Sequence, residues 1–223
     1  MNIELVNAWY RYSRVEDWAL RGISISFRSG EVIYIDGPNG SGKTTLLKIA
    51  SLIYRPLQGS VLVDGNNFWN LDENSKTLIR RKVIYVHDKP ILLRGTVLDN
   101  VAYGLHIRGV DRGSAFDTSM SILSVLGIDS LAHTPIQRLS TGQAQLVAIA
   151  RALAIKPEIL FLDEPFSNLD REKRLALIST LNQFRARGMG IVFSSHNADV
   201  MELGKHRRVV LGGGTIIDAY EVV

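Results

Sequence analysis

Short apolar segments rich in β-branched and aromatic residues recur along the chain, and longer segments with helical periodicity lie between several of them. The expected strands cover residues 22–27, 32–35, 61–63, 83–86, 159–162, 191–194, 209–211 and 215–217. This alternation of strands and helices predicts an α/β fold. Three glycines at residues 212–214 separate the last two strands and are typical of a turn.

The strands that begin at residues 32, 83, 159 and 191 are almost entirely apolar, as are strands buried on both faces of a parallel sheet. The first 30 residues and residues 59–65 instead indicate hairpin-like antiparallel strands. Between residues 90 and 140 only helical periodicity is visible, at residues 96–105 and 114–126. We therefore predict a mostly parallel core, an N-terminal antiparallel β subdomain and an inserted helical subdomain.

Composition narrows the class of protein. Of the 223 residues, 46% are apolar and 22% charged, which excludes a disordered or fibrous chain and allows a sizeable core. No run approaches the roughly 18 to 20 apolar residues that span a bilayer, and the first residues lack the apolar block of a signal peptide. We expect a cytoplasmic chain without a membrane anchor of its own.

Cysteine usage and charge exclude further chemistry. The chain contains no cysteine, so disulfides, thiolate nucleophiles and cysteine metal sites are ruled out. The net charge of +4 indicates mainly solvated surface, with a mild bias towards anionic partners such as nucleotides or lipid headgroups. No nucleic-acid partner is expected.

The segment GPNGSGKTT directly follows the strand EVIYID and precedes the helical run LLKIASLI, at residues 46–53. It matches the GxxxxGK[ST] phosphate loop in its strand, loop and helix context, so a mere glycine-rich turn is the weaker interpretation. Lys43 is expected to reach the β- and γ-phosphates, and Thr44 to ligate Mg²⁺. The predicted nucleotide-binding residues of this loop are Gly37, Pro38, Asn39, Gly40, Ser41, Gly42, Lys43, Thr44 and Thr45.

Two adjacent acids, Asp163 and Glu164, end the apolar strand at residues 159–162. Ligand sites of α/β proteins form at the carboxyl ends of strands. Asp163 is expected to hold Mg²⁺ through water, and Glu164 to accept a proton from the water that attacks the γ-phosphate. Alone, such a pair could equally be a helix cap or a turn, but the upstream phosphate loop favours the catalytic interpretation.

The segment LSTGQAQLVAIARAL, from Leu139 onwards, makes a resemblance specific. Ser140 and Gln143 form a capping box, and an apolar stripe follows on the helix that they begin. By itself this predicts a well-capped helix with no ligand. Together with the phosphate loop and the acid pair, it resembles the ATP-binding subunit of an ABC transporter over essentially the whole chain, residues 1–223. The resemblance implies a single P-loop NTPase domain, with the β subdomain and core at about residues 1–87 and 141–223 and the helical subdomain at about residues 88–140.

The resemblance also assigns roles to individual residues. Tyr12 is similar to the aromatic residue that stacks on adenine, although a simple strand aromatic stays open. His196 is similar to the switch histidine that contacts the γ-phosphate. The signature, which faces the nucleotide of the other subunit, corresponds to Ser140, Thr141, Gly142 and Gln143. The loop between subunits corresponds to Ser167, Asn168, Leu169 and Asp170.

Three departures from the family pattern stand out. Asp88 occupies the place of a glutamine that senses the γ-phosphate and Mg²⁺, so we expect a metal ligand with altered metal dependence; a plain surface residue is the alternative. Thr141 replaces a glycine of the signature, and this extra bulk is compatible with slower closure. Ala144 and Leu146 stand where the family commonly has arginine just after the signature. This change affects only the ion pairs that those arginines would form, and not the contact with phosphate.

The implied function is that of a motor subunit that hydrolyses ATP with Mg²⁺ between two such subunits. Lys43, Glu164 and His196 are the expected catalytic residues. A membrane permease is expected to contact residues 88–109 and to hold the chain at the inner face of the cell membrane. The similarity of residues 89–105 to anion importers favours import over export, while the transported substrate is not encoded in a subunit that touches only ATP and permease.

Two alternatives remain open at this level: a soluble ABC ATPase of cofactor assembly, and a nucleotide-dependent binding switch with slow turnover, which the changes at Asp88 and Thr141 favour. A GTPase is disfavoured because the base-reading motif NKxD is missing from the sequence.

Overall fold

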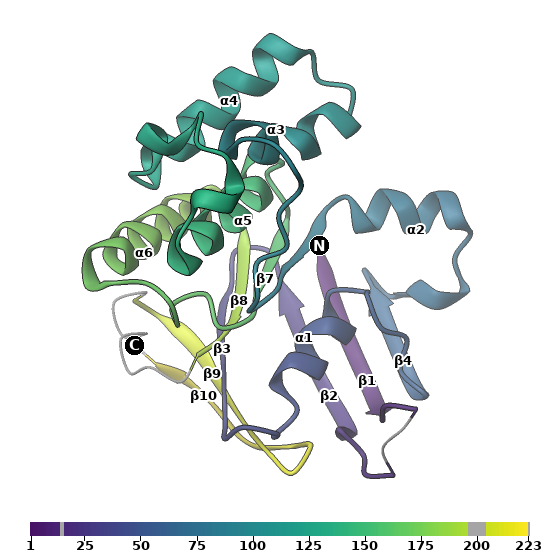
Figure 1. Cartoon of the computed structure of the whole chain (residues 1–223). Coiled ribbons are helices and arrows are strands. Elements are labelled where there is room, and N and C mark those ends of the chain that lie inside the picture. The colour runs from purple at the N-terminus through teal and green to yellow at the C-terminus, as the bar shows by residue number, and fades with distance from the viewer. Residues whose placement is uncertain (14–15, 196–203, 223) are drawn as a thin grey trace.

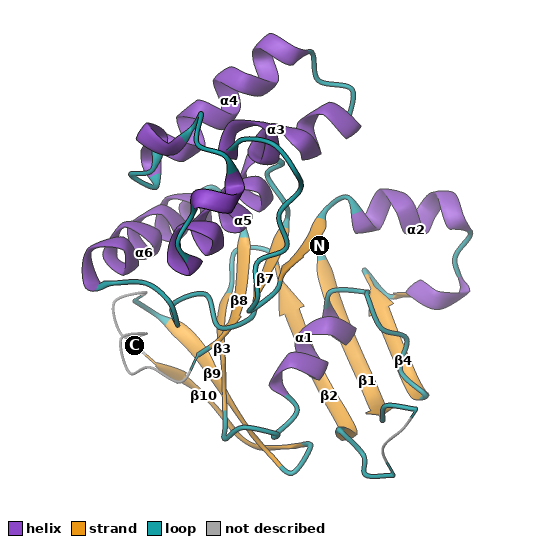
Figure 2. Ribbon diagram, viewed as in Figure 1, coloured by secondary structure: helices purple, strands orange, loops and turns teal. Residues whose placement is uncertain are grey.

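Two β-sheets organise the chain, and a group of helices covers one face of the larger sheet (Figures 1 and 2). The computed structural model describes residues 1–13, 16–195 and 204–222. The smaller sheet is antiparallel, with the order β2 (Leu20–Arg28), β1 (Asn2–Tyr10), β4 (Gln58–Val63) and β5 (Asn66–Asn67). The larger sheet has the order β10 (Thr215–Val222), β9 (His206–Gly212), β3 (Val32–Asp36), β8 (Gly190–Ser194), β7 (Ile159–Leu162) and β6 (Val83–Val86). All its strands run parallel except β10.

Six α-helices lie in the described part of the chain: α1 (Lys43–Ala50), α2 (Glu73–Arg80), α3 (Val97–Ile107), α4 (Arg112–Val125), α5 (Thr141–Ala154) and α6 (Arg171–Ala186). Three short 3₁₀ turns accompany them: Phe68–Asn70, Asp129–Leu131 and Ile136–Arg138. None of these helices is long and apolar enough to cross a membrane. The expected strands and the two expected helices at residues 96–105 and 114–126 are confirmed within a few residues.

The central strands are almost entirely apolar because both faces of the larger sheet are covered, and their polar residues, such as Asp36 of β3 and Ser194 of β8, lie at the carboxyl ends. Along β3, Val32 and Tyr34 face a cluster formed with α3 to α6, whereas Ile33 and Ile35 face a second cluster with α1 and the smaller sheet. Successive side chains of a strand point to opposite faces, so the two cores share one sheet. This arrangement confirms the prediction of a mostly parallel, doubly covered sheet beside an antiparallel one.

Helix α5 begins where the sequence predicts it. Ser140 and Gln143 form both hydrogen bonds of the capping box, at 2.9 and 3.3 Å, which satisfies N–H groups that the first helical turn leaves free. Leu146, Ile149 and Leu153 are fully buried. The helix is therefore anchored between the sheet and the neighbouring α3 and α4.

The first helix is displaced from its predicted position. The apolar run suggested residues 46–53, but α1 covers Lys43–Ala50. Its start lies inside the phosphate loop because Gly42 serves as the N-cap. Its end comes early because Leu52 takes a left-handed conformation with φ 65°, in which a helix cannot continue.

Candidate active site

The phosphate loop spans the gap between β3 and α1, and its backbone needs glycine at two crowded points. A Cβ on Gly37 would overlap the carbonyl oxygen of Leu211 in β9, and one on Gly42 would come 2.5 Å from the carbonyl oxygen of Ala19. Both glycines also have positive φ, 140° and 104°, which other residues rarely adopt. The loop is therefore wedged between β2 and β9.

Lys43 lies inside this loop. Its Nζ donates hydrogen bonds to the carbonyl oxygens of Gly37, at 2.7 Å, and Pro38, at 3.2 Å, and the side chain is only 7% exposed. The ammonium group is thus held at the curved inner face of the loop. The N–H groups of the first turn of α1 point out of the helix N-terminus, as in any α-helix. Together with the Lys43 ammonium group they form a site that can bind an anion.

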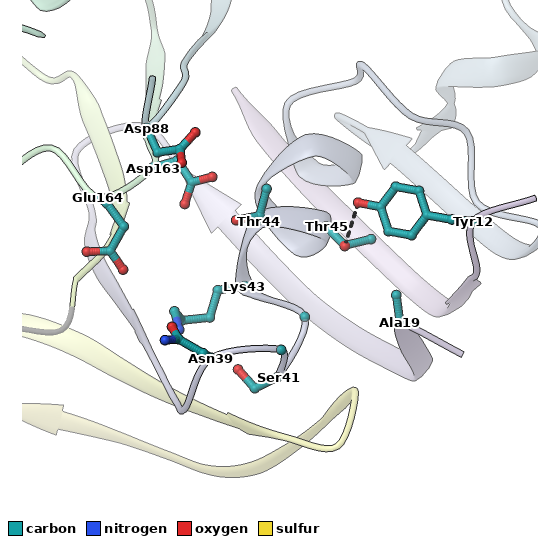
Figure 3. Close-up of a pocket in the computed structure, with 12 residues that line it drawn as sticks. Tyr12, Ala19, Asn39, Ser41, Lys43, Thr44, Thr45, Asp88, Asp163 and Glu164 are labelled. Atoms are coloured by element: carbon teal, nitrogen blue, oxygen red, sulfur yellow. Dashed lines mark hydrogen bonds between the residues drawn. The ribbon is translucent and has the colours of Figure 1, made fainter. Parts of the chain in front are cut away.

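A cavity of about 340 Å³ lies above the loop and unites residues far apart in the sequence (Figure 3). Its lining consists of Tyr12, Ala19, Asn39, Gly40, Ser41, Gly42, Lys43, Thr44, Thr45, Asp88, Asp163 and Glu164. Of the predicted loop residues, Gly37 and Pro38 contribute their carbonyl groups to Lys43 rather than lining the cavity. The cavity therefore brings together the phosphate loop, the acids Asp163 and Glu164, and the individually predicted residues Tyr12 and Asp88.

Asp163 is held by the two strands on either side of β7. Its Oδ1 accepts a hydrogen bond from Ser194 Oγ of β8 at 2.7 Å, and its Oδ2 accepts one from the Tyr85 hydroxyl of β6 at 2.9 Å. Burial and the charge of Asp163 raise the pKa of Tyr85 well above its ordinary value, so the phenol stays protonated and donates. The sequence analysis missed Tyr85 and Ser194, whose only signal is their place at the ends of neighbouring strands.

Glu164 leaves the strand through a left-handed residue. Its φ is 48°, and its N–H donates to Ser194 Oγ at 3.0 Å. Ser194 therefore binds the carboxylate of Asp163 and the backbone of Glu164 at once. In Figure 3 the Glu164 side chain faces the cavity across from Lys43.

The donor set of this cavity suits a magnesium ion. Thr44, Asp88 and Asp163 present one hydroxyl and two carboxylates to the same space, and Mg²⁺ prefers oxygen ligands while keeping several waters or phosphate oxygens. Each oxygen of Asp163 accepts one hydrogen bond and keeps a second lone pair. Among the described residues, no three or more His, Cys, Asp or Glu side chains are grouped so that they could hold a metal ion, so phosphate oxygens and waters would have to complete the coordination.

Asp88 also has a partner outside the cavity. The Nδ1 of His87 contacts its Oδ1, and both side chains are more than one-third exposed. The predicted alternative, a plain surface residue, therefore accounts for the exposure of Asp88 but not for its place in the cavity lining.

Tyr12 lies at the other end of the cavity, on the far side of α1 from the acids (Figure 3). Its hydroxyl is hydrogen-bonded to Thr45 Oγ1 at 3.0 Å, and its ring packs edge-on against Tyr10 and Tyr54. Tyr12 is 37% exposed and lines the cavity, so a ligand bound there can contact it.

The signature and the loop at residues 167–170 lie apart from this cavity. In the described chain, none of Ser140, Thr141, Gly142 and Gln143, and none of Ser167, Asn168, Leu169 and Asp170, lines it. The two segments instead contact each other, since a Cβ on Gly142 would overlap the carbonyl oxygen of Asn168. Thr141 is exposed at the start of α5. The predicted switch residue His196 lies outside the described residues.

Comparisons with known proteins agree with this geometry. The family model of the ABC transporter matches residues 20–167. A probable anion import ATP-binding protein of Haloferax volcanii is 34% identical, over 90% of this chain and 74% of its own length. The lipoprotein-releasing system ATP-binding protein LolD of Hyphomonas neptunium is 38% identical, over 91% and 90%.

The fold has close counterparts among solved structures. The dimeric post-hydrolysis state of the ATP-binding cassette MJ0796, bound to ADP and Pi, superposes with a TM-score of 0.90 and 28% identity, over 99% of both chains. The chain thus combines a phosphate loop after β3, a pair of acids after β7 and a signature helix on the fold of that cassette. The chain belongs to the ATP-binding subunits of the ABC transporter family, and it binds and hydrolyses ATP.

Proposed function

We propose that the chain is the motor subunit of an ABC transporter and hydrolyses ATP between two copies or two related subunits. The observation that carries this proposal is the separation of the signature from the cavity. Ser140 and Gly142 form a capped helix N-terminus outside the site that holds Lys43 and Glu164. A second subunit would bring its own signature to the open side of the cavity and complete the site.

Within one site we assign the following roles. Lys43 and the loop amides bind the phosphates, and Tyr12 stacks on adenine. Thr44 and Asp163 would hold Mg²⁺, with Asp88 as a further ligand, and the ion neutralises phosphate charge when bound. Asp163 is aligned for this by Tyr85 and Ser194.

Glu164 is the proposed general base. Its backbone is fixed by Ser194, and its carboxylate faces the cavity opposite Lys43, where the terminal phosphate of ATP would lie (Figure 3). A carboxylate there can accept the proton of the attacking water. His196 is proposed to orient the same water, by resemblance alone.

The partner in the membrane is proposed to bind an apolar groove beside the site. This groove, of about 360 Å³, lies between β6, α3 and α5 and includes Ile91, Tyr103 and Ile107. These three side chains are 68%, 46% and 60% exposed. Val86 and His87 of the groove directly precede Asp88 of the nucleotide cavity in the chain. A movement of Asp88 when nucleotide binds would therefore shift the groove and any segment docked in it. The chain would thereby be peripheral on the inner face of the membrane.

The direction of transport is the finer part of this proposal. We favour import, on the similarity of residues 89–105 to anion importers. The relatives named for anion import and for lipoprotein release differ in direction, so the test is biochemical. A tagged chain should co-purify with a polytopic permease in detergent, and Ile107→Asp in the groove should abolish this while leaving ATP binding intact.

Two outcomes would favour the alternatives. Recovery of the tagged chain with soluble assembly proteins, and with no membrane protein, would favour an ATPase of cofactor assembly. ATP binding with negligible turnover, unchanged in Glu164→Gln, would favour a binding switch.

A further inference from the structure

Asp36, the last residue of β3, places a carboxylate at the entrance of the phosphate loop. Its Oδ1 accepts a hydrogen bond from the N–H of Gly37 at 2.7 Å. Its Oδ2 accepts hydrogen bonds from Nη2 and, at 3.1 Å, from Nε of Arg208. Arg208 lies on β9, which pairs directly with β3. Two nitrogens of one guanidinium on one carboxylate fix the orientation of both groups.

Two aromatic rings hold Arg208 in this position. Its guanidinium carbon lies 5.5 Å from the ring centroid of Tyr34 on β3 and 5.9 Å from that of Tyr220 on β10. Cation–π contacts of this length are favourable and leave the edge nitrogens free to donate. Residues of three adjacent strands, Tyr34 and Asp36 of β3, Arg208 of β9 and Tyr220 of β10, thus form one cluster in which Arg208 donates to Asp36.

Gly37, the first residue of the phosphate loop, is bound by this cluster and by β9. The N–H of Gly37 is bound by Asp36, its carbonyl accepts from Lys43 Nζ at 2.7 Å, and its Cα lies against the backbone of Leu211 in β9. The turn after β9 adds another contact, because the N–H of Gly214 donates to the carbonyl of Ser41 at 3.2 Å. The hairpin of β9 and β10 thus contacts the loop at Gly37 and at Ser41.

Tyr34 extends the cluster towards the reacting end of the cavity. Its hydroxyl donates to the carbonyl oxygen of Ser195 at 2.9 Å, and its ring stacks on Phe193. Burial and the Asp36 carboxylate raise the pKa of Tyr34 to about 12, with a smaller contribution from Glu164. The phenol therefore stays neutral beside two acids, and the cluster connects the phosphate loop with the ends of β7 and β8.

A carboxylate beside a phosphate loop is unfavourable unless its charge is neutralised. Like charges separated by a few ångströms repel strongly in a partly desolvated site. We propose that Arg208 is a positioning residue for ATP: it neutralises Asp36, so that this carboxylate orients the Gly37 amide without repelling bound phosphates. The proposal rests on the assignment of ATP to this loop and goes beyond it, because neither residue lines the cavity.

The test compares Arg208→Met, Asp36→Asn and the double variant, with a fluorescent ATP analogue as the probe. Arg208→Met should weaken binding about tenfold at low salt, because the charge of the Asp36 carboxylate at the start of the phosphate loop is then no longer neutralised by Arg208. The loss should be smaller for the ADP analogue and should shrink as salt rises. Asp36→Asn should cost no more than about threefold, because its amide oxygen still accepts from Gly37. The double variant should recover to within about threefold of the wild type.

Arg207→Met is the matched control. Arg207 precedes Arg208 on the same strand and points to the opposite face, where it contacts Ser26 and Glu31, so its loss should leave ATP affinity unchanged. Arg208→Lys, which keeps the charge, should also retain affinity, and thermal melting establishes that each variant is folded.

Wild-type affinity in Arg208→Met, or no recovery in the double variant, would overturn the proposal. A wild-type chain that fails to bind the analogue would instead count against the ATP site itself.

Discussion

Gly142 of the signature lies so close to Asn168 that a single methyl group on Gly142 would overlap the carbonyl oxygen of Asn168. The segment that is expected to face the other subunit's nucleotide is therefore packed on the segment expected to contact that subunit. Each of these two segments lies at the N-terminal end of a helix, since Ser140 is the N-cap of α5 and Asp170 is the N-cap of α6. Any change of bulk at Gly142 must move the loop at residues 167–170.

Gly142→Ala should therefore lower ATPase activity at least tenfold and destabilise the fold by about 1 to 3 kcal/mol, as overpacking does. Steady-state ATPase rates and chemical denaturation measure the two effects. Gly113→Ala is the matched control, because Gly113 is likewise the second residue of a helix, α4, and an added Cβ would meet only Asp111, at 3.4 Å. Equal activity of the Gly142 variant and the wild type would show that the contact has no functional consequence.

Glu164→Gln should abolish turnover and retain ATP binding, since an amide cannot accept the proton of the attacking water. We expect a fall in the ATPase rate of about 10²- to 10⁴-fold, the usual contribution of a general base. Size-exclusion chromatography with Mg²⁺ and ATP should show an ATP-dependent dimer. A monomer at saturating ATP would contradict the proposed two-subunit site.

Asp88→Gln should change how the ATPase rate depends on Mg²⁺. The substitution removes one carboxylate from a cavity that also holds Asp163 and Glu164, so more Mg²⁺ should be needed for half-maximal rate. Asp88→Asn separates the loss of charge from the gain in length. Identical Mg²⁺ titrations for all three proteins would exclude Asp88 as a metal ligand.

Tyr12→Ala should weaken ATP binding by about 1 to 3 kcal/mol, the usual value of one stacked base. Tyr12→Phe keeps the ring and loses only the hydrogen bond to Thr45, so its affinity should stay within about threefold of the wild type. Equilibrium binding of a fluorescent ATP analogue measures both variants. Equal losses in the two would assign the effect to the hydroxyl instead of the ring.

Acid should remove the contribution of Asp36 to stability. Burial acts to raise the pKa of Asp36, but the hydrogen bonds from Arg208 and Gly37 outweigh it and hold the pKa below its ordinary value of 3.8. A lowered folded-state pKa means that the stabilisation is complete above pH 3.8 and is lost as the pH falls through the folded-state value. Denaturation at several pH values should therefore give a shallower acid dependence for Asp36→Asn than for the wild type.

Much of the site could be predicted because its motifs are contiguous. A phosphate loop needs its glycines, its lysine and the following helix N-terminus in one short segment, so residues 37–45 carry the prediction by themselves. The capping box at Ser140 and the acids after an apolar strand are local for the same reason. Alternating apolar segments likewise predicted the strands of the larger sheet, whose burial on both faces the structure confirms.

Tertiary structure alone decided which distant residues support those motifs. Asp163 is held by Tyr85 and Ser194 because the strand order places β6 and β8 beside β7, and hydrophobic periodicity does not specify that order. Asp36 and Arg208 lie 172 positions apart in the sequence and meet because β9 pairs with β3. The partner of a polar side chain on a strand can be identified only when the neighbouring strand is known, so predicting these contacts requires the fold. Predicting the nucleotide loop requires only the sequence, because its residues are contiguous.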